Sequence, residues 1–273
     1  MPVFQLPKYD RHTYIAVNGN IVPDSGLALA SANPLLIASN AIEGTSQVNK
    51  FGENPTVTVN TTADVWDGTG VYPWPATADI THLRQAVDQA AMRGGVVEVQ
   101  GLDANYVLTV QDVTLNATNT TTPVALTTPL LRVFRMKVQV AVVGNQDIEL
   151  RNVGGGTTYA IIRAGFNQTL MALYSVPAGK TAYMTQYYAD NVPTSTRTPD
   201  NVDFDLWFRP FGKEFQIKHM RGTTVATSGF EHQFNPYLRI PEKTDIKISA
   251  SVSGAQGEDG NPHAGFDLIL IDN

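Results

Sequence analysis

From Val96 to the C-terminus the sequence repeats one pattern, in which short runs rich in Val, Ile, Thr, Tyr and Phe are separated by turns of Gly, Pro and Asn. Residues 202–208 are an example, because apolar and polar residues alternate along them. A period of two puts the apolar side chains on one face of a strand. Many short strands at close spacing are typical of a β-sandwich or a jelly roll. We therefore expect a mainly β protein that contains a jelly-roll-like β-sandwich.

Two β blocks follow from this pattern. Residues 177–273 are expected to form the jelly-roll-like β-sandwich, and residues 65–176 are expected to form a second β block. That second block is predicted to carry one α-helix at residues 79–93. The apolar residues from Ile80 to Ala90 follow helical spacing there, and two glycines come directly after the segment.

Residues 1–64 differ from the rest of the chain. Their apolar residues come in short clumps broken by prolines, and no helical or strand period persists along them. We expect an extended N-terminal arm that lies either over its own domain or on a neighbouring subunit. Asn18-Gly19 is a signal for a hairpin turn within this arm. The candidate partner-binding residues of the arm are Phe4, Tyr9, Tyr14, Ile15, Leu35, Leu36 and Ile37.

Two long strands carry expectations about packing. The strand predicted at residues 130–143 alternates so that Arg132 falls on its polar face. The last strand, residues 264–272, is apolar on both faces near the C-terminus. A strand of that kind is either central in its sheet or covered by a neighbouring subunit.

Composition argues against several classes of function. The chain has no cysteine, which excludes disulfides, thiolate catalysis and cysteine–zinc sites. The formal net charge is −6 and no basic arm occurs, which argues against a protein that grips phosphates. No apolar run is long enough for a membrane helix, and no secretory signal pattern begins the chain. We therefore expect no nucleic acid and no membrane among the partners, and neither a cofactor nor a metal.

No residue set points to catalysis. Asp203 and Asp205 share one face of a predicted strand and could act on glycosides, but a solvated strand face gives the same pattern. His219 and His232 could face each other across a hairpin, which supplies too few ligands for a metal. Residues 258–261 are rich in oxygen ligands but lack the spacing of a calcium loop. The sequence therefore predicts a protein that is not an enzyme.

The three tryptophans are candidates for an aromatic surface. Trp66 and Trp74 lie in a turn-rich segment before the second β block, and Trp207 lies in a predicted strand. Rings in such a segment either plug the end of a β domain or stack on sugar rings.

Five stretches of the chain share a further property. They are residues 64–67 (DVWD), 97–103 (VEVQGLD), 171–184 (MALYSVPAGKTAYM), 230–248 (FEHQFNPYLRIPEKTDIKI) and 264–273 (AGFDLILIDN). These motifs resemble virion structural proteins of tailed bacteriophages, many of them from marine and other aquatic environments. The resemblance extends from about residue 39 to residue 273, and it brings no catalytic residues with it.

The resemblance implies a non-enzymatic component of a bacteriophage particle, made in the cytoplasm of the bacterial host. The leading position is the capsid exterior, as a decoration or cement protein that bridges capsid subunits. Its partners would be the major capsid protein and copies of itself, with a homotrimer as the expected oligomer. The alternatives are a tail, collar or head–tail adaptor protein, and a virion protein that binds a glycan or receptor.

Overall fold

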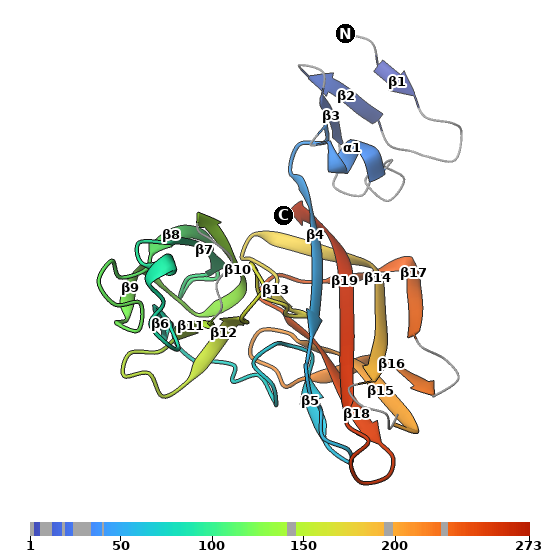
Figure 1. The fold of residues 1–273 in the computed structure, drawn as a ribbon. Helices are drawn as coiled ribbons and strands as arrows, with labels where there is room; N and C mark the ends of the chain where they lie inside the picture. The colour runs from blue at the N-terminus through green and yellow to red at the C-terminus, as the bar shows by residue number, and fades with distance from the viewer. Residues whose placement is uncertain are drawn as a thin grey trace.

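The computed structural model describes residues 3–5, 13–17, 20–23, 34–39, 41–140, 146–193, 199–224 and 229–273. They are built mainly of antiparallel strands (Figure 1), so the prediction of a mainly β protein is confirmed. Helices are few and short in this part of the chain, and none is long and apolar enough to cross a membrane.

Two facing sheets form the larger body. One sheet has the strand order β17-β14-β19-β4, and the other has the order β13-β18-β15-β16, with β5 also paired to β18. Strands β4, β5 and β14 to β19 have the two-sheet Greek-key order of an eight-stranded jelly roll. The strands of this body are β4 (Thr45–Glu53), β5 (Thr62–Asp64), β13 (Leu173–Ser175), β14 (Lys180–Pro193), β15 (Asn201–Arg209), β16 (Gln216–Thr224), β17 (Gly229–Ile240), β18 (Asp245–Ser253) and β19 (Gly260–Asp272).

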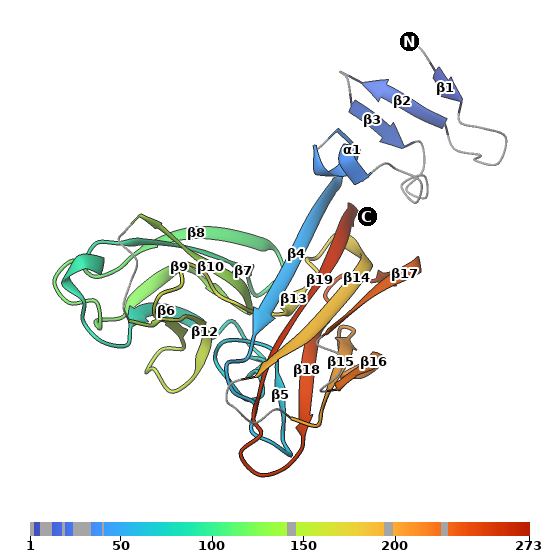
Figure 2. The ribbon, with the colours of Figure 1, turned by 45° about the vertical axis from the view of Figure 1, so that its right-hand side comes forward.

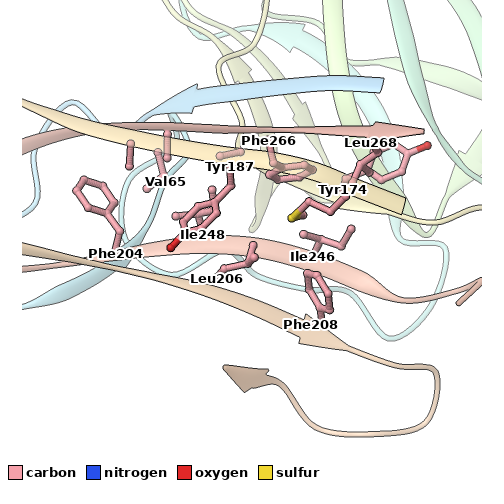
Figure 3. Close-up of a cluster of buried hydrophobic side chains, with 14 of the residues drawn as sticks. Val65, Tyr174, Tyr187, Phe204, Leu206, Phe208, Ile246, Ile248, Phe266 and Leu268 are labelled. Atoms are coloured by element: carbon pink, nitrogen blue, oxygen red, sulfur yellow. The ribbon is translucent and has the colours of Figure 1, made fainter. Parts of the chain in front are cut away.

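The space between the two sheets is filled by apolar side chains. Figure 3 shows Phe204 and Leu206 of β15 facing Phe266 of β19 and Tyr187 of β14 across the sandwich. All four side chains are completely buried. Burying such large side chains supplies the main favourable contribution to folding of this body.

A second body is inserted into the jelly roll between β5 and β13, and we call it the inserted block (residues 66–171). It has its own apolar core and lies to one side of the jelly roll (Figures 1 and 2). Its two sheets have the orders β10-β7-β8 and β12-β11-β6-β9. The strands are β6 (Ile80–Gln85), β7 (Val96–Leu102), β8 (Leu108–Thr114), β9 (Val124–Leu130), β10 (Arg132–Val140), β11 (Ile148–Arg151) and β12 (Thr158–Ile162).

This insertion changes the expected division of the chain. The expected arm, residues 1–64, included β4 and β5, but all nine residues of β4 pair with β19, and β5 pairs with β18. Strand β4 also passes close to the end of the inserted block, because a Cβ at Gly52 would lie 2.8 Å from the Cα of Met171. The jelly roll therefore takes strands from both sides of the inserted block, and its boundary is not at residue 177.

The predicted helix at residues 79–93 is wrong. Residues Ile80–Gln85 form strand β6, and Ala90–Met92 form only a short 3₁₀ turn, η2. The pairing of β6 with β9 shifts register between Ile80 and His82, so that Ile80 and Leu83 are both buried. A β-bulge thus produced the i, i+3 spacing that imitates a helix.

The last strand is central, as one of the two alternatives predicted. Strand β19 lies between β14 and β4, and its residues Phe266, Leu268 and Leu270 face the core. Its other apolar face carries Ile269 and Ile271, which pack against the cluster formed by Ile42 and by Ile37 of the short helix α1 (Pro34–Ala38). One turn of helix from the N-terminal segment therefore covers the outer face of this strand.

The first strands of the chain form a separate small sheet. Strands β1 (Val3–Gln5), β2 (Thr13–Val17) and β3 (Asn20–Pro23) pair in the order β1-β2-β3. The pairing of Val17 with Asn20 confirms the hairpin predicted at Asn18-Gly19. Figures 1 and 2 both place this sheet beyond the end of β4, apart from the jelly roll.

Candidate functional site

The candidate partner-binding residues of the N-terminal segment fall into three groups. Phe4, Tyr14 and Ile15 lie in strands β1 and β2, whereas Tyr9 lies outside the described residues. Helix α1 holds the other three. Leu35 is 70% exposed, Leu36 is partly buried, and Ile37 is buried against β19. Within α1, Ile37 therefore packs against its own chain, whereas the Leu35 side chain is exposed.

Trp66 does not belong to an aromatic surface, because only 3% of it is exposed. Its indole N–H donates to the Gly70 carbonyl at 3.1 Å, and its ring meets the Tyr72 ring edge-on with centroids 5.1 Å apart. Trp66 lies in the core of the inserted block. Trp66 therefore fits the first of the two alternatives for this segment, in which the rings fill the end of a β domain.

Trp74 and Trp207 are half-buried and belong to one strip of alternating rings and cations. The Trp74 ring lies 5.4 Å from the ring of Phe215, and the Lys247 ammonium lies 5.0 Å from Phe215 and 5.7 Å from Trp207. The Arg209 guanidinium lies 5.1 Å from Trp74. Cations over ring faces hold aromatic rings in place by electrostatic attraction. The strip runs across the junction of the inserted block and the jelly roll.

A buried ion cluster ties the two bodies together at the same junction. Arg132 of the inserted block donates from Nε to Asp245 Oδ1 at 2.8 Å and from a terminal nitrogen to Oδ2 at 3.0 Å. Arg209 donates to Asp245 Oδ2 at 2.9 and 2.6 Å, and the Ser175 hydroxyl donates to Oδ1. Only 5% of Arg132 and 2% of Asp245 are exposed. One carboxylate thus accepts hydrogen bonds from two guanidinium groups, and that of Arg132 reaches it across the junction.

The expectation for Arg132 was therefore wrong, because it is buried and not on a solvated face. It stands at the start of β10, and its guanidinium also donates to the carbonyls of Pro75 and Leu131, at 2.7 and 2.9 Å. The register of β10 shifts just beyond, between Val133 and Arg135. The partners of Arg132 come from distant parts of the chain, so no local motif could reveal the cluster.

His219 and His232 do face each other, with ring centroids 4.1 Å apart. They do so across the sandwich and not across one hairpin, because β16 and β17 belong to facing sheets. The Tyr187 hydroxyl and His219 Nδ1 are hydrogen-bonded at 2.5 Å. Strands β16 and β17 are the outer strands of their sheets. The histidine pair therefore closes the flank where the two outer strands meet.

The surroundings of His219 predict that the stability of the folded protein depends on pH. Burial lowers the pKa of His219 below its usual value of about 6.5, and the nearby His232 and Arg221 lower it further. A histidine with a lowered pKa binds its proton more weakly in the folded state than in the unfolded state. The contribution of His219 to the free energy of unfolding is therefore fully present above about pH 6.5, and it is lost as the pH falls toward the lowered pKa. Urea unfolding at pH 5.5 and 7.5 measures this change, which we expect to shrink in His219→Gln.

The matched control is His82→Gln in the inserted block, which should keep the pH dependence of the wild type. If the free energy of unfolding of His219→Gln differed between pH 5.5 and pH 7.5 as much as that of the wild type, groups other than His219 would cause the pH dependence.

The predicted carboxylates differ in their hydrogen bonding, because Asp205 Oδ1 is buried without a hydrogen-bond partner in the described structure, whereas Glu258 and Asp259 accept backbone N–H groups. Asp203 and Asp205 share the outer face of β15, and burial, with repulsion from Asp203, raises the pKa of Asp205. In the loop before β19, Glu258 accepts the backbone N–H of Ala255 at 2.6 Å, and Asp259 accepts that of Val59 at 2.9 Å. Within the described ranges, no three acidic or histidine side chains are grouped to hold a metal ion.

Comparisons with known proteins leave the family open. No protein-family model and no curated protein matches the sequence. Among solved structures, the VP2 subviral particle of infectious bursal disease virus is similar at 11% identity, over 84% of this chain and 72% of that chain, with a TM-score of 0.23. A structure of the Gt strain of the same virus is similar at 12% identity, over 84% and 73%, with a TM-score of 0.21. Scores this low carry no argument, so the jelly-roll assignment depends on strand order alone.

Proposed function

We propose that this chain is a non-enzymatic structural protein of a bacteriophage particle, placed on the capsid exterior as a decoration or cement protein. The jelly-roll body would sit over a junction between capsid subunits, and the N-terminal segment would lie on a neighbouring subunit. The partners are the major capsid protein and further copies of the chain, arranged as a homotrimer.

The observation that carries the proposal is the path of the N-terminal segment. Among the described strands, β1, β2 and β3 pair only with one another. A sheet of three such short strands is marginal by itself and needs another surface to pack against. Helix α1 anchors the root of the segment to β19 through Ile37, so the sheet beyond it can reach a neighbour while its base stays fixed.

The fold of the body supports the same proposal by analogy. Jelly rolls recur in viral capsid proteins and in lectin domains. A fold is shared by many functions, so this analogy narrows the choice without deciding it. Many weak contacts repeated by particle symmetry would stabilise a shell through their combined effect.

The test is the copy number of this chain per particle, measured by quantitative mass spectrometry against the major capsid protein. We expect on the order of hundreds of copies, because a cement protein follows the symmetry of the whole shell. A result of roughly a dozen to a few dozen copies would instead assign the chain to the tail, collar or head–tail adaptor, and the cement mechanism would be abandoned.

A further inference from the structure

A pocket opens at the junction of the inserted block and the jelly roll, next to the buried ion cluster. The inserted block contributes residues 74–76, Tyr106 and Arg132, and the jelly roll contributes residues 209–213, Lys243 and Asp245. Its volume is about 230 Å³. Pockets for drug-sized ligands usually have about 300–1,000 Å³, so this one suits a ligand of a single ring.

The pocket is cationic although the whole chain carries a net charge of −6. Its lining includes four cationic side chains and one carboxylate, an excess of three positive charges. Asp245 is already engaged by Arg132 and Arg209. Lys213 and Lys243 have no carboxylate partner among the residues that the structure describes. Unbalanced cations in a concave site attract an anionic group.

Aromatic rings stand beside these lysines. The Phe211 ring meets the Tyr106 ring edge-on at 5.8 Å, and the Lys243 ammonium lies 5.4 Å from the Phe211 centroid. Phe211 is 65% exposed, so its ring is accessible from the pocket side of the surface. The indole N–H of Trp74 is buried and has no hydrogen-bond partner in the described structure. The wall therefore offers an apolar ring face as well as charge.

The backbone of the pocket is held in an uncommon conformation at two positions. Tyr106 has φ 64° and Lys243 has φ 57°, values that bulky residues rarely adopt. Both are fixed by hydrogen bonds to one segment, because Lys243 N–H donates to the Val176 carbonyl at 2.8 Å and Ala178 N–H donates to the Tyr106 carbonyl at 2.9 Å. Strained residues of this kind gather at binding sites, where surrounding structure holds them in place.

We propose that this pocket binds a carboxylated pyranose, that is, an acidic sugar ring. The ring would lie against Phe211 and Tyr106, and its carboxylate would meet Lys243 and Lys213. A nucleotide needs more space than the pocket has, and a bare phosphate would leave the aromatic wall unused. The inference goes beyond the particle role proposed above, and it holds for the isolated protein whatever its position in a virion.

The test is calorimetric titration of the full-length protein with glucuronate and with N-acetylneuraminate. Glucose and inorganic phosphate serve as comparison ligands. Both acidic sugars are expected to bind, and glucose is not. Lys243→Asn removes the charge and keeps a residue that tolerates positive φ, and Phe211→Ala removes the exposed ring. Each variant is expected to weaken binding by about tenfold or more.

Lys218→Asn, on the exposed strand β16, is the matched control and should leave the affinity unchanged. The proposal is overturned if neither acidic sugar binds at about 10 mM, or if either pocket variant keeps the wild-type affinity. It is also overturned if inorganic phosphate binds as tightly as the sugars, which would show a simple anion site. None of these results alters the copy number per particle, so the two proposals fail separately.

Discussion

Replacing Asp245 with alanine is expected to lower the free energy of unfolding by about 3–5 kcal/mol. Asp245 is the one carboxylate that accepts hydrogen bonds from both Arg132 and Arg209 in the described cluster. Its removal would leave the Arg132 guanidinium buried without a counter-charge, and burial of an unpaired ion is among the largest costs a single substitution can cause. The contact between the inserted block and the jelly roll would weaken at the same time.

Urea unfolding at pH 7 measures this effect, with Asp272→Ala as the matched control. Asp272 pairs with Lys180 at the exposed end of β19, and exposed pairs contribute less than about 1 kcal/mol. If Asp245→Ala cost no more than the control, the ion cluster would not hold the junction together.

Deleting residues 1–62 is expected to abolish cooperative folding of the jelly roll, whereas deleting residues 1–33 is expected to preserve it. The longer deletion removes all of β4 and leaves one side of the central strand β19 without a partner. Strand β4 also packs against the inserted block at Gly52. Loss of a complete strand from one sheet should exceed the total stability of a typical domain, about 5–15 kcal/mol.

Near-ultraviolet circular dichroism and thermal unfolding of both deletions test this expectation. The shorter deletion keeps α1 and β4, and it should unfold within a few degrees of the full-length chain, roughly the effect of less than 1 kcal/mol. A cooperative transition in the longer deletion would mean that β4 is dispensable. The shorter deletion is then also the right variant for capsid-binding experiments, because its body should remain folded.

Much of the architecture could be predicted from local pattern. Alternation along residues 202–208 predicted a strand, because a half-buried strand needs a period of two. The last strand is apolar on both faces, which predicted that it is either central in its sheet or covered by a neighbouring subunit. Asn18-Gly19 predicted a hairpin. These features depend on neighbours in sequence or on the burial of whole strand faces, which residue types report directly.

The errors have one physical origin, which is contact between residues far apart in the chain. The register shift of β6 gave Ile80 and Leu83 a helical spacing, and only its pairing with β9 and β11 identifies it as a strand. Strand β4 has a mostly polar sequence with no clear period, and it folds because β19 offers it a full set of backbone partners. Local propensity was overridden in both cases by tertiary pairing.

The pocket at the junction likewise could not be predicted from local sequence. Phe211, Tyr106 and Lys243 come from separate loops, and neither the excess positive charge around them nor the exposure of Phe211 can be seen along the sequence. By itself, the sequence determined that this protein is mainly β and that its last strand is apolar on both faces, because these follow from residue type and period. The tertiary structure alone decided that one β body is inserted into another, because long-range strand pairing and a buried Arg132–Asp245 contact join segments that no local pattern connects.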